Sequence, residues 1–317
     1  MFMLKLKAFL CTLCLLILTA RRSAYSVVMP DRSILLNPLS RSVEGAGAEF
    51  LPLIGGWAEL DKFAGMATDS DHCFDARLGA AAEVFRLGRN YDFTVSSDVE
   101  LVATPDSPIL FNPRALFWQE TFQFGAAMDS SFLHLGYAHR CKHDIDNIQV
   151  QDSTGERSIM VYIYDSLFAR WILQPGGLSF RAGSPCINRL YCRTDIFVLS
   201  SDERSGSMPD KNANNLRYGF SGGLDCTVFR SRGFTAYSRL NYSLYIFSSG
   251  YNTAGAWYRE FSADYSAEAG ISFAGDAGAV SLFIIFEKQD MTMINPQNES
   301  AYFISAGVRL SGTDMYY

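Results

Sequence analysis

The chain has 317 residues and a formal net charge of −6, and 48% of its residues are hydrophobic and 14% aromatic. This acidic balance excludes the basic stripe with which proteins track the phosphates of nucleic acid, so no nucleic-acid partner is expected. The mean hydropathy is only +0.03 despite the many aromatic residues, which suits strands that alternate apolar and polar residues.

The first 26 residues have the order of a secretory signal peptide. Lys5 and Lys7 precede an apolar run from Ala8 to Ala20, and small residues follow around Ala24 and Ser26. The run is too short to span a bilayer. We therefore expect export with cleavage of residues 1–26, an uncleaved anchor being the alternative. Without the four cations of this segment, the formal charge falls from −6 to −10.

The rest of the chain, residues 27–317, alternates apolar and polar residues with a period of two over long stretches, which is typical of strands. From Phe234 to Ile246 the even positions are mainly apolar, and the odd positions include Thr235, Arg239 and Asn241. Such runs exceed the usual soluble strand and match the length that a tilted strand needs to cross a bilayer. Residues 27–75 are either an N-terminal extension or contain a first strand.

Twelve runs are predicted as strands, in chain order: 76–88, 91–104, 115–126, 131–141, 158–170, 176–183, 192–200, 214–229, 233–247, 257–273, 278–288 and 300–311. A further strand near 47–54 is an alternative. An open sheet edge in hydrocarbon leaves backbone groups unpaired, so the sheet should close. The predicted fold is all-β: a single transmembrane antiparallel up-and-down β-barrel of about 12 strands. Trp118, Trp171 and Trp257 near strand ends are candidates for interfacial girdles.

Five cysteines follow residue 26, which is an odd number in a compartment that permits disulfides. Cys186 and Cys192 are the best-placed pair, as a clip on a loop. None of the cysteine spacings is typical of a structural zinc site.

One short segment concentrates groups that can do chemistry. Residues 133–147 hold three of the four histidines together with Cys141 and two acids. In strand geometry His139, Cys141 and His143 share a face with Leu133, Leu135 and Tyr137, and this is the apolar, lipid-facing side. His134, Arg140 and Lys142 should point inward. Polar residues in a lipid-facing row are costly and invite a functional explanation.

His139, Cys141, His143 and Asp146 resemble a motif of a poorly characterised family of bacterial outer-membrane β-barrels, His-x-Ser-x-His-x-Gly-Asp, with Cys141 for Ser and Ile145 for Gly. More faintly, His139 and Cys141 are similar to the His-x-Ser of outer-membrane phospholipases and lipid A deacylases. In those enzymes the histidine is the base and the serine the nucleophile. The resemblance implies His139, Cys141, His143 and Asp146 as candidate catalytic residues, although the absent serine removes the expected nucleophile.

Two other interpretations of the segment remain open. His139, His143 and Asp146, or the oxygens of Asp144, Asp146 and Asn147, would suit calcium or another divalent metal; otherwise no cofactor is expected. Alternatively the histidines satisfy backbone groups and the acids pair with neighbouring cations.

These observations leave three functions. The first is a non-catalytic pore or envelope component of the bacterial outer membrane, and the second a lipid-acyl hydrolase that acts on outer-membrane lipids. The third is a soluble secreted β-barrel that binds an apolar ligand. The expected partners are outer-membrane lipids and, during insertion, the barrel-assembly machinery.

Overall fold

The computed structural model describes residues 35–36, 47–65, 73–88, 90–104, 112–128, 130–144, 150–151, 157–158, 160–174, 186–204, 210–211, 216–231, 233–247, 261–289, 301–312 and 315–316. Residues 1–26, predicted as the signal peptide, lie outside this set. In the described part of the chain no helix is long and apolar enough to span a bilayer.

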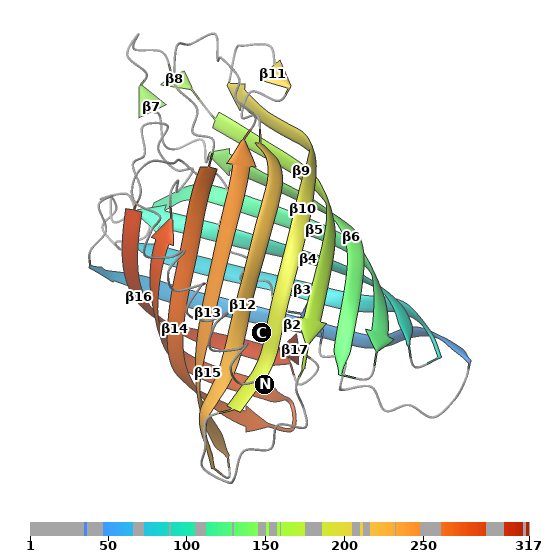
Figure 1. Cartoon of the computed structure of the whole chain (residues 1–317). Coiled ribbons are helices and arrows are strands. Elements are labelled where there is room, and N and C mark those ends of the chain that lie inside the picture. Colours follow the sequence, from blue (N-terminus) through green and yellow to red (C-terminus); the bar gives the residue numbers. More distant parts are fainter. Residues whose placement is uncertain are drawn as a thin grey trace, which may run out of the picture.

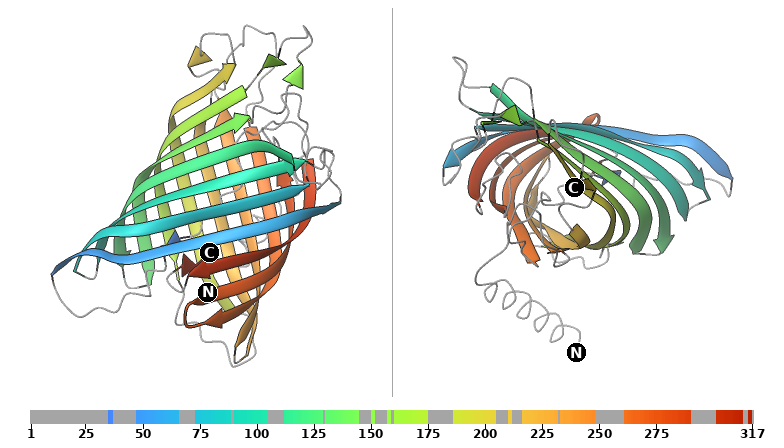
Figure 2. Two further views of the ribbon diagram at one scale, coloured as in Figure 1. Left: turned by 180° about the vertical axis from the view of Figure 1, so that it is seen from behind. Right: turned by 90° about the horizontal axis from the view of Figure 1, so that it is seen from above.

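Twelve long antiparallel strands form a closed barrel (Figures 1 and 2). They are β2 (Ala48–Gly65), β3 (Phe74–Leu87), β4 (Tyr91–Thr104), β5 (Asn112–Met128), β6 (Ser131–Asp144), β9 (Met160–Leu173), β10 (Cys186–Arg204), β12 (Leu216–Ser231), β13 (Phe234–Phe247), β14 (Phe261–Gly275), β15 (Gly278–Gln289) and β16 (Ala301–Gly312). Each pairs with the next in sequence, and β16 pairs with β2 to close the sheet. The predicted all-β barrel of about 12 strands is confirmed.

The predicted strands differ from the observed ones at β2 and at the start of β10. The alternative strand near 47–54 is present as part of β2, which extends to Gly65. The run predicted at 176–183 lies outside the described residues. β10 begins at Cys186 and is longer than the predicted 192–200.

The predicted disulfide between Cys186 and Cys192 is wrong. Both residues lie on β10 and Cys192 is a free, exposed thiol. Six residues of extended strand span about 20 Å, far beyond the Cα separation that a disulfide allows. The segment is a wall strand and not a loop that a disulfide would clip.

Short turns lie at one end of the barrel, which we call the short-turn end. Residues 88–90, 129–130, 232–233 and 276–277 connect consecutive strands there, and only the β9–β10 connection at this end is long, whereas every connection at the other end, the long-loop end, has seven or more residues. Gly88 and Gly233 have φ values of 56° and 96°, in the left-handed region that glycine adopts without steric cost. In outer-membrane barrels the short turns face the periplasm.

The outer wall is apolar, as the alternation predicts. Leu135, Leu240, Leu282 and Ile284 are examples of outward side chains that are 49–60% exposed. Toward the short-turn end, aromatic rings cluster on the same face: Phe85, Phe93 and Phe124 have ring centroids 4.9–6.2 Å apart. The barrel therefore presents lipid-exposed apolar residues with aromatic groups near a rim, as bacterial outer-membrane proteins do.

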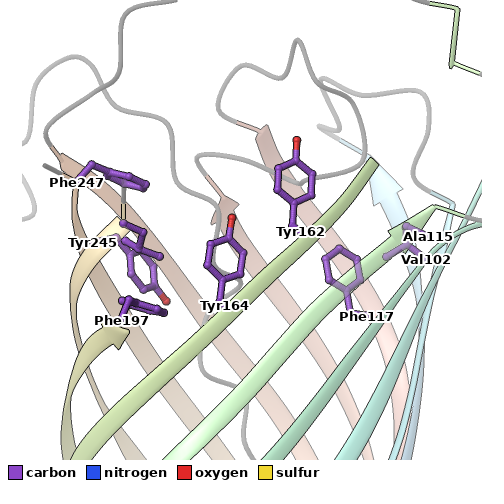
Figure 3. Packing of buried hydrophobic residues seen from close by; sticks show 9 residues of the cluster. Val102, Ala115, Phe117, Tyr162, Tyr164, Phe197, Tyr245 and Phe247 are labelled. Atoms are coloured by element: carbon purple, nitrogen blue, oxygen red, sulfur yellow. The ribbon is translucent and has the colours of Figure 1, made fainter. Parts of the chain in front are cut away.

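Buried aromatic and aliphatic side chains gather in the lumen toward the long-loop end, where charged residues such as Asp75, Lys142 and Glu287 are buried as well. Nine buried side chains project inward there from β4, β5, β9, β10, β12 and β13 (Figure 3): Val102, Ala115, Phe117, Tyr162, Tyr164, Phe197, Leu216, Tyr245 and Phe247. Tyr164 and Phe197 pack edge to face, with ring centroids 6.2 Å apart. Phe117, within this cluster, is 1% exposed.

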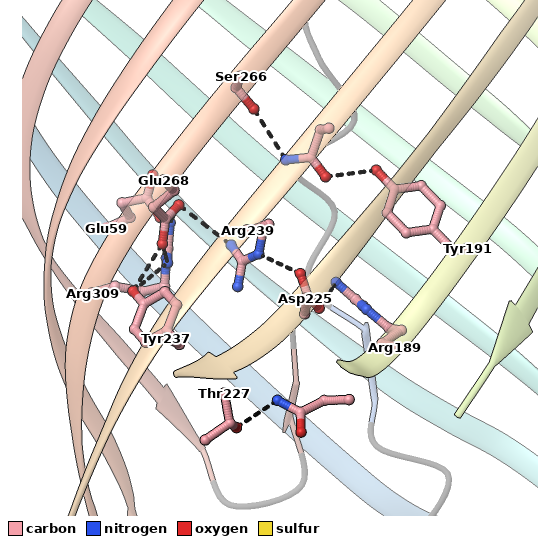
Figure 4. A network of polar contacts seen from close by, with 12 residues as sticks. Glu59, Arg189, Tyr191, Asp225, Thr227, Tyr237, Arg239, Ser266, Glu268 and Arg309 are labelled. Atoms are coloured by element: carbon pink, nitrogen blue, oxygen red, sulfur yellow. Dashed lines mark hydrogen bonds and ion pairs between the residues drawn. The ribbon is translucent and has the colours of Figure 1, made fainter. Parts of the chain in front are cut away.

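The opposite half of the lumen is charged, and its charges are paired (Figure 4). Arg309 on β16 forms two hydrogen bonds with Glu268 on β14, at 2.7 and 3.0 Å, and also pairs with Glu59 on β2. Arg239 on β13 then joins Glu268 to Asp225 on β12, at 3.4 and 2.9 Å. The chain continues to Arg189 on β10, 2.6 Å from Asp225. This set of six residues is called the luminal ion-pair chain below.

At the short-turn end the C-terminal tail turns into the barrel. Its short strand β17 (Met315–Tyr316) pairs with β1 (Leu35–Leu36). Met315 is 7% exposed and packs against Trp57 and Ala81, whose side chains face the lumen. The tail therefore narrows the lumen at this end.

Candidate lipid-facing site

β6 carries the predicted chemical cluster, and its side chains point as the alternation indicated. His134 and Lys142 are buried inside the barrel, at 5% and 1% exposed, whereas Leu135 is exposed on the outer face. His139, Cys141 and His143 follow the same outward alternation as Leu135. Asp146, the fourth candidate, lies outside the described residues, as does Asn147.

His139 is joined to a carboxylate that the sequence analysis did not single out. Asp165 on β9 stands directly opposite His139, and its Oδ1 lies 2.6 Å from the imidazole Nδ1. When Asp165 is ionised and the imidazole is neutral, the proton of this contact lies on Nδ1, and the Nε2 lone pair can accept another hydrogen bond. Their side chains are 29% and 18% exposed on the lipid-facing wall.

A second carboxylate continues the row. Glu120 on β5 is registered opposite His139, on the side away from Asp165. We call Glu120, His139 and Asp165 the polar rung. Tyr137 lies on the same outward row of β6, one rung toward the short-turn end.

Apolar residues border the polar rung on both sides. Toward the long-loop end the next registered rung is Trp118, Cys141 and Ile163, and toward the short-turn end it is Phe122, Tyr137 and Leu167. Trp118, Phe122 and Leu167 are 41–52% exposed on the outer wall. The polar rung is therefore an island within an apolar surface, where a hydrogen-bonded charge is costly and usually functional.

Cys141 lies close to the polar rung but is poorly accessible. It is 9% exposed, between the larger side chains of Trp118 and Ile163. His143 lies one rung further out, near the end of β6, and its side chain is exposed. The structure thus brings His139 and Cys141 to the same face, two residues apart, with Asp165 behind the histidine.

The sequence contains a signal for the two carboxylates. The outward row of β9 reads Val161, Ile163, Asp165, Leu167, Ala169 and Trp171, and Asp165 is its one charged member. Glu120 interrupts the outward row of β5 in the same way, between Trp118 and Phe122. A search for single charges within apolar, strand-period rows would have found both residues.

Within the described residues no three His, Cys, Asp or Glu side chains are grouped so that they could hold a metal ion. The predicted metal site included Asp146 and Asn147, which lie outside the described residues. The calcium interpretation therefore stays a prediction.

Comparison with known proteins bears on the fold alone. No family model matches the chain, and no curated protein matches it. Among solved structures, the chain is similar to the KdgM porin, with 10% identity, a TM-score of 0.40, and 81% of this chain and 98% of the porin covered. The outer membrane phospholipase of Salmonella typhi has 11% identity and a TM-score of 0.41, with 81% and 90% covered. LpxR from Salmonella typhimurium has 8% identity and a TM-score of 0.37, with 81% and 99% covered. The chain is a closed twelve-stranded antiparallel β-barrel of the outer-membrane type.

Proposed function

We propose that this protein is a non-catalytic component of the bacterial outer membrane whose lumen is closed to general diffusion. The observation that supports this proposal is the luminal ion-pair chain. Glu59, Glu268, Arg239 and Arg309 are only 1–6% exposed, so these side chains are packed against each other and do not line an open aqueous path. Ion pairs buried to this extent require partners on all sides to offset desolvation.

The packed aromatic residues at the long-loop end support the same proposal. An open pore needs a continuous wet path, whereas the nine inward side chains there are buried and apolar. A twelve-stranded interior is small enough to be filled by side chains of this size.

Planar-bilayer recording of the refolded full chain tests the closed state. We expect no steady conductance from the unaltered protein, alongside a porin control that conducts in the same membrane. Stable single-channel steps from the unaltered protein would contradict the proposal.

Cell fractionation and the mobility of unheated and boiled protein on gels test the outer-membrane location. A soluble protein with unchanged mobility would favour a secreted barrel instead.

The polar rung favours a second candidate function, a lipid-acyl hydrolase. In this reaction His139 Nε2 takes the proton of the Cys141 thiol, and the sulfur attacks the ester carbonyl of an acyl chain. The bond from carbonyl carbon to alcohol oxygen breaks, and the alcohol leaves with the proton held by His139. Water then hydrolyses the thioester and releases the fatty acid. Asp165 would hold His139 in the tautomer that this role needs.

Turnover of phospholipid and lipid A by the folded chain in vesicles tests this candidate. Activity that falls at least about 100-fold in both His139→Ala and Cys141→Ala would support it. Cys192→Ser is the matched control, because Cys192 is a free thiol on the outer wall away from the polar rung. Unchanged lipids, with an active control enzyme present, would rule the hydrolase out.

A further inference from the structure

The polar rung leaves two hydrogen-bonding groups open on the lipid-facing wall. Asp165 contacts His139 at Nδ1, and the described residues place no second group on Nε2. The carboxylate of Glu120, one strand away on β5, has neither a hydrogen bond nor an ion pair among the described residues, although it is registered opposite His139. Hydrocarbon offers no water to bind, so a carboxylate and an imidazole nitrogen at this position require a partner.

The wall around the polar rung does not supply that partner. β5, β6 and β9 lie side by side, and β5 and β9 are paired on their far edges with β4 and β10 (Figure 1). On the rungs to either side, the outward side chains of Trp118, Phe122 and Leu167 are 42%, 41% and 52% exposed and apolar. All of these strands belong to the described residues. The partner must therefore come from outside the barrel, within the membrane.

The chemistry of the polar rung determines which surface fits it. In a bilayer, apolar flanks do not by themselves bring two proteins together, because lipid tails cover such surfaces equally well. Close packing and hydrogen bonds between polar side chains decide association there instead. A fitting surface must present a hydrogen-bonding nitrogen to Glu120 and a carboxyl group to His139, one strand spacing apart.

The wall of a second copy presents both groups at that spacing. All copies are inserted with their short turns toward the periplasm, so a two-fold axis that relates two copies runs along the membrane normal. An axis that passes between Glu120 and His139 places Glu120 opposite the partner's His139, and His139 opposite the partner's Glu120. Neighbouring strands lie about 4.8 Å apart, and a tilt of roughly 35–45° displaces the facing groups in height by only about 3 Å.

We propose that two copies of this chain associate in the membrane through the polar rung, by reciprocal contacts between Glu120 and the partner's His139. One proton between Nε2 and the carboxylate makes each contact attractive, whether the imidazole or the carboxyl group carries it. When the imidazole carries it, Nδ1 donates to Asp165 and Nε2 donates to the partner's Glu120. One cation then lies between two carboxylates. The bulky outward side chains of Trp118 and Phe122 pack against the partner on either side of the contact.

This association goes beyond the closed barrel proposed above and requires only that the wall meets lipid. The two proposals fail separately, since a dimer that conducts would contradict the closed lumen and leave the contact intact. The contact also occupies His139 Nε2, which the hydrolase candidate needs as its base. The dimer and the hydrolase are therefore alternative roles for the polar rung.

Sedimentation equilibrium of the refolded full chain in neutrally buoyant detergent micelles tests the association. We expect a dimer from the unaltered chain and, for Glu120→Leu and for His139→Leu, a dissociation constant at least about tenfold higher. Lys288→Leu is the control. It removes a charge from the outward row of β15, away from the polar rung, and should leave the dimer unchanged. A monomeric unaltered chain, or equal association of all variants, would overturn the proposal. Heat-modifiable mobility verifies that each variant folds.

Mixing the two variants tests whether the contact is reciprocal. Two copies of either variant alone have no contact between Glu120 and His139. A mixed dimer has one, between Glu120 of the His139→Leu copy and His139 of the Glu120→Leu copy. We therefore expect the equal mixture to associate at least about threefold more tightly than either variant alone. No recovery in the mixture would overturn the proposal.

Photo-crosslinking in the producing cell identifies what meets the wall there. A photoreactive residue replaces Phe122, beside the polar rung, and in a matched control it replaces Ile284, which is 60% exposed on β15. We expect a product of twice the chain's mass, containing this chain alone, only from position 122. Products with a different protein, with lipid alone, or of equal amount at both positions would overturn the proposal.

Discussion

The inner and outer faces of the barrel wall hold charge in different ways. Inside, Arg309 has two carboxylate partners, and the luminal ion-pair chain spreads charge over strands from β2 to β10. Outside, the polar rung is three residues wide and bordered by apolar side chains. A network in which neighbouring charges share partners offsets the cost of burying them, whereas an isolated polar group that faces lipid is costly and invites a functional explanation.

The largest expected effect comes from breaking the inner network. Arg309→Ala leaves Glu59 and Glu268 buried without their shared cation, so we expect a loss of about 3–5 kcal/mol in the free energy of unfolding. Urea unfolding of the refolded barrel measures it. Arg230→Ala, an exposed arginine on β12, is the control and should change stability by less than about 0.5 kcal/mol. Equal losses in the two variants would mean that the luminal pairs do not stabilise the fold.

A second test compares two phenylalanines on β5. Phe117 is 1% exposed in the luminal aromatic cluster, and Phe122 is 41% exposed on the outer wall. Phe117→Ala opens a cavity and should cost about 3–4 kcal/mol. Phe122→Ala should cost clearly less, because lipid fills the space. The same unfolding titration measures both, and a larger loss at Phe122 would reverse the assignment of the two faces.

Substitutions in the polar rung should change the free energy of unfolding less, and the single and double substitutions should differ in direction. Asp165→Asn weakens the bond to His139 and should cost roughly 1–3 kcal/mol. The double variant His139→Phe with Asp165→Val restores an apolar row and should be at least as stable as the unaltered chain. A double-mutant cycle measures the coupling. Simple additivity of the two substitutions would show that the 2.6 Å contact carries no coupling energy.

The smallest effect concerns the cysteines. Cys192→Ser should change stability by less than about 0.5 kcal/mol, because Cys192 is exposed and forms no disulfide. Maleimide labelling of the folded chain should modify Cys192 quickly and Cys141 slowly. Rapid labelling of Cys141 would indicate that Trp118 and Ile163 leave its thiol open to the membrane side.

Much of the fold could be predicted from the sequence because strand geometry is local. The period-two alternation in 234–246 predicted both the strand and the face on which Arg239 and Asn241 lie, and the same reasoning placed His134 and Lys142 inside and Leu135 outside. The first strand is harder to predict, because Pro52 and two glycines interrupt the alternation of β2. The strand near 47–54 is therefore predicted only as an alternative. The Cys186–Cys192 pairing failed because β10 begins earlier than its alternation suggested.

The candidate site, too, could be predicted from the sequence only in part. Its histidines stand out in the sequence because three of them lie in one short segment, and periodicity assigns the outward side of His139 and Cys141. Asp165 is 26 positions away from His139, and only the register between β6 and β9 brings the two together. Register depends on the pairing of whole strands, which no local pattern encodes. The luminal ion-pair chain has the same origin, since it follows from how the strands of the barrel pair. The sequence by itself determined the class, the strand faces and the chemical cluster, and tertiary structure alone decided which charges meet.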